Sequence, residues 1–374
     1  MQEENVTGQA SVDRKAYGVT TSGEKVDLFT LTNANGLSAN IIEYGGTLTS
    51  LMVPDASGQL ENVVLGLDSL EDYEACEAYL GALIGRSGNR IAKGRATVDG
   101  TTLDLPINNG PNHLHGGPKG FHKVVWSGKA HTDDVGAHLE LRYRSVDGEE
   151  GYPGNLDVVV IYSLTNDDEL RIDYQAQTDK PTICNLTHHS YFDLSGGSAR
   201  SVLNTLLQLD ATQFTPVDET LIPTGDLRDV EGTPFDFTEL QPIGERISED
   251  DEQLAYAGGY DHNFVLTAEP DEDGLRAAAL VIDPDSGRAM EVLTTEPGMQ
   301  FYSGNFLDGS LRGQGRVYRK RSGFCLETQG FPDSPNQPAF PTTILMPGDT
   351  YRSTTLYCFM TADESDDEDE GHDD

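Results

Sequence analysis

Two histidine pairs and one glutamate are the side chains of this sequence best suited to chemistry. His113 and His115 lie two positions apart, ahead of two glycines, and His188 and His189 are adjacent. On a strand, residues two apart share a face and adjacent residues point to opposite faces, so only one of the adjacent pair could face a given site. Glu327 follows an apolar run, where a carboxylate is costly unless it is paired or functional. Imidazole and carboxylate together are the parts of metal-free general acid–base catalysis.

Two other segments carry polar groups in suggestive surroundings. Residues 259–264 set Asp261 and His262 among aromatic side chains, and residues 85–90 form a glycine-rich loop with two arginines. The ordinary role of such residues is structural. We therefore expect His113, His188 and His262 to be hydrogen-bonded inside the fold rather than catalytic.

A metal, a phosphate or a serine nucleophile is less well supported. His113-x-His115 resembles the start of a cupin metal site, but Pro118, Lys119 and Gly120 stand where a carboxylate is needed. The glycine-rich loop lacks the GxxxxGK[ST] order of a phosphate-binding loop. No GxSxG elbow is present. We expect no metal and no cofactor.

Composition excludes two classes of partner. The chain has 374 residues, with 63 Asp and Glu against 25 Lys and Arg, so its formal net charge is −38. Binding to nucleic acid or to an anionic membrane surface depends on cationic side chains, so we expect neither partner. No apolar run approaches the roughly 18 residues of a membrane helix. The opening residues also lack the apolar core of a signal peptide.

The acid excess also bears on where the protein works. A surface of one charge repels itself and weakens the fold at ordinary salt. At about 1 M salt the Debye length of about 3 Å screens most of this cost. The four cysteines, Cys76, Cys184, Cys325 and Cys358, form no CxxC pair and are expected to be reduced. We therefore expect a cytoplasmic protein in a salt-loaded cell, as in an extreme halophile.

The segments that must position these groups are mostly predicted to be strands. Apolar residues alternate with polar ones in residues 139–145 and again in residues 170–176, as in half-buried strands. Glycine and proline interrupt the chain at turn spacing. Only short helices are expected, at residues 69–79 and within residues 238–252. The pattern predicts an all-β fold of antiparallel strands, with a sandwich favoured over a barrel.

The chain shows no internal linker, so we predict a single domain over residues 16–361. Residues 1–15 form an N-terminal extension. Residues 362–374 contain nine acidic residues, cannot bury apolar surface and are predicted to be a disordered tail.

At the chemically suggestive residues the sequence resembles the galactose mutarotase, or aldose 1-epimerase, family. The matching segments follow the family's order over most of the chain and include GALIGRSGNRIAKG at 81–94, NHLHGGPKGF at 112–121, GEEGYPG at 148–154, NLTHHSYF at 185–192, PVDETLIPTG at 216–225, YDHNF at 260–264, PGMQFY at 297–302 and GFCLETQ at 323–329. One such motif would be weak, but the ordered set is highly specific.

The resemblance implies a β-supersandwich that binds a monosaccharide, an aldohexose such as galactose or glucose, in an open cleft without a cofactor. It implies that the enzyme interconverts α and β anomers, with His189 as the general acid and Glu327 as the general base. The implied sugar-binding residues are Asn89, Arg90, His115, Ser190, Tyr191, Asp261 and Gln300. Two positions depart from the family pattern: His188 replaces an asparagine and Glu296 replaces a glutamine.

This mechanism sets expectations for charge. His189 must be protonated and Glu327 ionised at the start of the reaction. Asp261 would help to keep the imidazolium charged, and Arg90 would favour the ionised carboxylate. Tyr191 or Tyr302 could pack on the apolar face of the sugar.

Two other functions remain open at this point. A non-catalytic sugar-binding module on the same scaffold would keep the binding residues but lose the acid or the base. A glycosidase would need two carboxylates about 5–10 Å apart, for which Glu327 and Asp261 are the candidates. A hexose-6-phosphate epimerase would need additional cations at the pocket, which this lysine-poor chain does not suggest.

Overall fold

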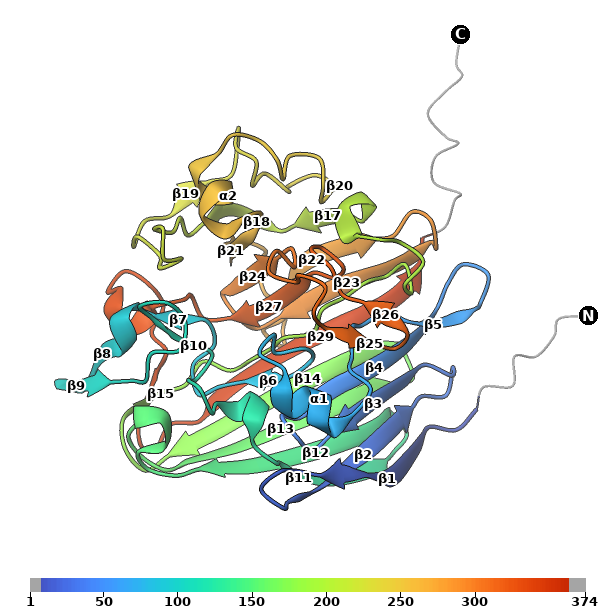
Figure 1. Ribbon diagram of the computed structural model, residues 1–374, viewed down its shortest axis with the longest axis horizontal. Helices are drawn as coiled ribbons and strands as arrows, with labels where there is room; N and C mark the ends of the chain where they lie inside the picture. The colour runs from blue at the N-terminus through green and yellow to red at the C-terminus, as the bar shows by residue number, and fades with distance from the viewer. Residues whose placement is uncertain (1–7, 363–374) are drawn as a thin grey trace, which may run out of the picture.

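The computed structural model describes residues 8–362, which form three antiparallel sheets joined by short ribbons (Figure 1). The largest sheet has nine strands in the order β11 (Ser127–Thr132), β12 (Gly136–Ser145), β13 (Leu156–Thr165), β14 (Glu169–Thr178), β29 (Tyr351–Thr361), β23 (Arg288–Thr294), β22 (Arg276–Ile282), β17 (Leu206–Leu209) and β20 (Gln241–Pro242). Its neighbouring strands all pair in antiparallel fashion.

Two sheets of five strands complete the framework. The first runs β1 (Ser11–Val19), β2 (Lys25–Thr32), β3 (Ser38–Ile42), β4 (Thr47–Pro54) and β5 (Leu60–Asn62). The second runs β19 (Arg228–Asp229), β18 (Ala211–Phe214), β21 (Asp261–Leu266), β24 (Gly298–Tyr302) and β27 (Cys325–Gln329). The paired ribbons are β6 (Leu83–Ile84) with β16 (Thr187–His188), β7 (Arg90–Ile91) with β10 (His113–Leu114), β8 (Arg95–Val98) with β9 (Thr101–Asp104), β15 (Thr182–Ile183) with β28 (Ile344–Leu345), and β25 (Arg312–Gly313) with β26 (Arg316–Val317).

The predicted alternation is confirmed in the nine-stranded sheet. Residues 139–145 lie in β12 and residues 170–176 in β14, and in both strands the apolar members are buried or half-buried. The second five-stranded sheet packs on this sheet, because Tyr357 of β29 donates its hydroxyl to the carbonyl of Leu326 in β27, at 3.2 Å. The first is tied to it by Tyr162 of β13, which donates to the carbonyl of Gly46 at 2.7 Å. One continuous apolar core includes residues of all three sheets, which confirms the sandwich architecture.

The helices are shorter than predicted. Helix α1 (Leu70–Ala75) begins after Ser69, whose hydroxyl accepts the N–H of Asp72 at 3.2 Å, and it ends before Tyr79 turns into the left-handed region at φ 57°. Within residues 238–252, where short helical pieces are predicted, only Glu252 belongs to a helix, and the rest consists of turns, bends and the two-residue strand β20. Helix α2 (Glu252–Ala257) starts only after Asp251 provides a carboxylate cap. Within residues 8–362 no helix is long and apolar enough to cross a membrane.

The structure describes more than half of the predicted N-terminal extension but almost none of the predicted C-terminal tail. Strand β1 begins at Ser11 and pairs with β2, so part of the segment assigned to the N-terminal extension belongs to a sheet. The predicted acidic tail lies outside the described residues, apart from Ala362. The four cysteines are free, and Cys76, Cys184 and Cys325 are buried.

Candidate active site

Three neighbouring strands supply one wall of a cleft. The cross-strand rows are Asp261–Tyr302–Cys325 and Asn263–Gln300–Glu327 on β21, β24 and β27. Residues opposite one another in a ladder share a face, so these rows project to the same side of the sheet. Alternation sends Leu326 and Thr328 to the other side, where the Thr328 hydroxyl meets that of Thr355 on β29. The buried carboxylate of Glu327, which follows an apolar run in the sequence, therefore points toward the cleft.

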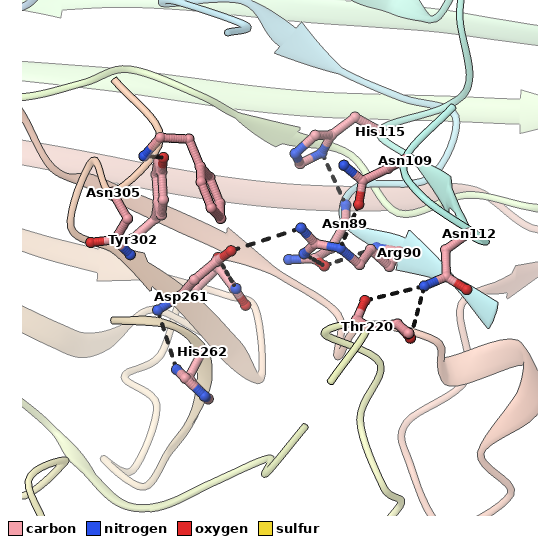
Figure 2. A network of polar contacts seen from close by, with 12 residues as sticks. Asn89, Arg90, Asn109, Asn112, His115, Thr220, Asp261, His262, Tyr302 and Asn305 are labelled. Carbon is pink, nitrogen blue, oxygen red and sulfur yellow. Dashed lines mark hydrogen bonds and ion pairs between the residues drawn. The ribbon is translucent and has the colours of Figure 1, made fainter. Parts of the chain in front are cut away.

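A second wall comes from the β7–β10 ribbon. Asn89 and His115 both adopt left-handed backbone conformations, with φ 56° and 51°. Both are residue types in which such conformations are enriched. The amide of His115 donates to the carbonyl of Asn89 at 3.0 Å, and the amide of Asn89 donates to Nδ1 of His115 at 3.1 Å (Figure 2). This reciprocal pair fixes the ring of His115 beside the cleft, and Oδ1 of Asn89 accepts the amide of Arg90 at 2.8 Å.

Arg90 connects this ribbon to the sheet wall. Its Nε donates to Oδ1 of Asn109 at 3.1 Å, and its Nη2 lies 3.8 Å from Oδ2 of Asp261 (Figure 2). Oδ1 of Asp261 accepts a hydrogen bond from Nε2 of Gln300 at 2.7 Å. Asp261 is thus held between a cation and an amide. Burial raises the pKa of Asp261, and Arg90 opposes this shift.

Alternation decides which of the adjacent histidines faces the cleft. His188 pairs with Leu83 in the ladder of β16 and β6, and its ring lies edge-on to Tyr162 in the interior. His189 points the other way, with its ring 5.2 Å from that of His115. Nε2 of His189 lies 3.7 Å from Oε1 of Glu327. The imidazole and the carboxylate, far apart in the chain, thus meet at the cleft.

The cleft encloses about 480 Å³, within the range of small-molecule pockets. The predicted residues that line it are Asn89, Arg90, His115, His189, Tyr191, Asp261 and Glu327. The remaining two predicted residues do not line it. Gln300 donates its Nε2 to Asp261, and Ser190, next to His189, has a buried hydroxyl that finds no hydrogen-bond partner among the described residues.

Sequence reasoning missed part of the lining. Tyr79 packs edge-on against His115, with ring centroids 4.6 Å apart, and lies 5.7 Å from the ring of His189. Side chains within residues 306–311 also line the cleft, and among them Phe306 is 62% exposed and stacks on Tyr302. Tyr79 follows a short acidic helix and residues 306–311 carry no recognisable motif, so neither gave a signal.

Burial works against charge on either member of the His189–Glu327 pair. It lowers the pKa of His189 from 6.5 to about 4. Burial, together with Asp261, raises the pKa of Glu327 well above its ordinary value, while Arg90 opposes this shift as expected. Both preferences are met when the pair holds one proton on Glu327 and His189 is neutral. The expected starting state, an imidazolium beside a carboxylate, has the same proton count but is not the one that burial favours.

The expected role of Asp261 also needs correction. We expect it to keep the His189 imidazolium charged, but its carboxylate is paired with Arg90 and Gln300. Its charge instead raises the pKa of Glu327. Asp261 therefore acts on the carboxylate side of the pair.

One group at the cleft is close enough to be tested as a metal site. Possible ligand atoms of His115, His189 and Glu327 lie within 4.8 Å of one another. However, Nδ1 of His115 accepts the amide proton of Asn89, so the neutral ring carries its proton on Nε2. Burial keeps the pKa of His115 well below 6.5 and the ring neutral. His115 therefore presents an N–H donor rather than a ligand lone pair, which suits a sugar oxygen better than a cation.

Of the three histidines expected to be hydrogen-bonded inside the fold, His113 and His262 are, but both ring nitrogens of the buried His188 find no partner among the described residues. His113 bonds through Nδ1 to the carbonyl of Pro106 at 2.7 Å and through Nε2 to the hydroxyl of Tyr152 at 2.6 Å. The two histidines of this motif do not share a face, because the chain turns at His115. Nδ1 of His262 accepts the amide of Asp261 at 3.2 Å.

The sequence model of the family described as aldose 1-epimerase matches residues 27–358. The chain belongs to the aldose 1-epimerase family. This confirms the resemblance inferred from the ordered motifs, because the match covers the cleft and the three sheets apart from strand β1 and the ends of β2 and β29.

Known members of the aldose 1-epimerase family match this chain over nearly its whole length. It is 46% identical over 354 residues to the galactose mutarotase of Bos taurus, covering 94% of this chain and 99% of that protein. It is 41% identical over 340 residues to the aldose 1-epimerase of Escherichia coli, covering 90% and 96% of the two chains. The crystal structure of galactose 1-epimerase from Lactobacillus acidophilus superposes with a TM-score of 0.84 at 28% identity and covers 95% of this chain and 100% of that chain.

Proposed function

We propose that the protein is an aldose 1-epimerase that interconverts the α and β anomers of free aldoses such as galactose and glucose without a cofactor. The observation that carries the proposal is the pairing of Nε2 of His189 with Oε1 of Glu327, 3.7 Å apart at the cleft of a family member. Two groups this close can reach the two oxygens bonded to one anomeric carbon.

The reaction needs one proton at each of two oxygens. Glu327 takes the proton of the anomeric hydroxyl while His189 donates its proton to the ring oxygen, and the bond between C1 and the ring oxygen breaks. Rotation about the C1–C2 bond presents the other face of the aldehyde. Closure returns the proton from Glu327 to the new anomeric hydroxyl, and His189 recovers its proton from the attacking hydroxyl.

The sugar itself would bring the pair into the reactive state. An anomeric hydroxyl that donates to Glu327 favours the ionised carboxylate, and a ring oxygen that accepts from His189 favours the imidazolium. These hydrogen bonds oppose the burial that otherwise places the shared proton on Glu327. His115 contributes a neutral N–H donor for a sugar oxygen, and Asn89, Arg90 and Asp261 offer polar groups to hydroxyls.

Polarimetry of freshly dissolved α-D-galactose tests this function. Glu327→Gln should lower the catalysed rate by about 10²–10⁴-fold, because the base is lost while the shape of the side chain is kept. Glu296→Gln is the matched control, since it makes the same change at a buried carboxyl that bonds Tyr351 and does not line the cleft. Wild-type rates equal to buffer would refute the enzyme, and full activity in Glu327→Gln would refute this base.

We also propose a reducing, salt-rich cytoplasm as the site of action. The support is the net charge of −38 and the absence of disulfides among four cysteines. Free thiols suit a reducing compartment. Charge repulsion of this size is tolerated best where salt screens it.

A further inference from the structure

Three side chains with metal-binding atoms meet at the β11–β12 hairpin, outside the cleft. His131 of β11 and His138 of β12 are direct cross-strand partners, and Asp133 lies in the turn between the two strands. Possible ligand atoms of the three residues lie within 4.8 Å of one another. Strand β11 is an edge of the nine-stranded sheet (Figure 1). The aldose 1-epimerase reaction uses none of these groups.

His138 is already oriented as a metal-binding imidazole would be. The residue is buried, and its Nδ1 lies 2.8 Å from the hydroxyl of Ser163 on β13. A serine hydroxyl both donates and accepts, so it can accept the Nδ1 proton of the neutral tautomer whose Nε2 lone pair is free to bind an ion. A hydrogen bond to the far nitrogen is the usual support of a histidine ligand.

Asp133 is held in place by the turn. Its Oδ1 accepts the amides of Val135 at 2.8 Å and Gly136 at 3.2 Å, and it lies 2.9 Å from Nε2 of His138. Asp133 is exposed, so its carboxylate can be reached by an ion from solvent. His131 is exposed, and its ring stacks on that of His138 at 4.9 Å. A ring nitrogen of His131 lies within 4.8 Å of the ligand atoms of the other two residues.

We propose that His131, Asp133 and His138 bind one zinc-like divalent cation that ties the edge strand β11 to β12. Two imidazole nitrogens and one carboxylate oxygen, with water in the fourth position, are a tetrahedral set that Zn²⁺ accepts. Magnesium and calcium prefer oxygen ligands alone, so the two imidazoles select against them. The net charge of −38 raises the local concentration of any cation at this surface.

Calorimetric titration of the untagged full-length chain with ZnCl₂, in an excess of MgCl₂ to occupy bare carboxylates, tests the site. The wild type should bind one Zn²⁺ at this site, and His131→Ala should weaken that binding by more than about tenfold. His131 is exposed, so its replacement should leave the fold and the mutarotase rate intact. Zinc should also raise the melting temperature of the wild type more than that of His131→Ala.

Glu327→Gln separates this site from the cleft. It should retain the full zinc affinity, because the hairpin and the cleft share no residue. Equal zinc binding by the wild type and His131→Ala would overturn the proposal. So would loss of the strong site in Glu327→Gln, since the ion would then belong to the cleft.

Discussion

At the scale of the residue, the pair formed by His189 and Glu327 is best understood as two groups that share one proton. Neither pKa belongs to one side chain alone when two groups interact this closely. Burial disfavours charge on both, and a bound sugar supplies the hydrogen bonds that the charged forms lack. In the proposed mechanism, the weakly basic imidazole of His189 therefore serves as an acid only when substrate is bound.

The pH dependence of kcat/KM should report this pair in the free enzyme. A second proton must be added to His189, whose pKa is lowered to about 4, so activity should persist down to about pH 4 rather than fall near 6.5. Activity should fall on the alkaline side when the pair loses its shared proton. Blank-corrected polarimetry over the pH range checks this, and an acid limb near 6.5 would contradict it.

Glu296, where the family has glutamine, should make stability depend on pH. Burial raises the pKa of Glu296 above 4.5, so its contribution is present below the unfolded pKa and is lost as pH rises through the folded pKa. Glu296→Gln should therefore be more stable than the wild type above that range, by about 1–3 kcal/mol, while keeping an acceptor for the hydroxyl of Tyr351. Urea unfolding at pH 5, 7 and 8.5 measures the difference.

The exposed Glu269→Gln is the control for that experiment, because it removes the same charge without a burial cost. It should show no such pH trend. A stability gap between wild type and Glu296→Gln that is constant with pH would contradict the assigned cause.

At the scale of the element, the cleft depends on short segments that strand alternation does not describe. The turn that follows His115 is the clearest example of such a segment. Gly116 has φ 82°, and a Cβ placed there would overlap the carbonyl oxygen of Gly85. This close approach holds the histidine turn against the loop that leads to Asn89 and Arg90.

Gly116→Ala should therefore cost both stability and activity. Backbone strain of about 1–2 kcal/mol adds to overpacking of about 1–3 kcal/mol, and the displaced turn carries His115 out of position. Gly100→Ala is the matched control, because Gly100 has a similar φ of 76° with nothing within 4 Å of the added methyl. Gly100→Ala should lose only the stability that backbone strain costs, and it should keep full activity. Thermal melts and polarimetry compare the two, and equal effects would contradict the argument.

At the scale of the whole molecule, the acid excess dominates. The formal charge of −38 is spread along the chain, so its repulsion acts on the folded state as a whole. The Debye length is about 10 Å at 0.1 M and about 3 Å at 1 M salt. Most of the repulsion between surface carboxylates is therefore removed within that interval.

The melting temperature should rise as KCl increases from about 0.1 M to about 3 M, with most of the gain below about 1 M. Scanning calorimetry in KCl measures this. A matched series in sucrose, which strengthens burial without screening charge, separates the two effects. A melting temperature that falls with KCl would contradict the salt-rich setting.

The sequence by itself determined the strands, the family and most of the cleft residues. Alternation in residues 139–145 and 170–176 is local information, and the ordered motifs name His189 and Glu327 directly. Only the tertiary structure decided that His189 rather than His188 faces the cleft, that Tyr79 and residues 306–311 complete its lining, and that Asp261 serves Arg90 and Glu327. These features depend on ladder register, left-handed turns and burial, which arise from contacts between segments distant in the chain.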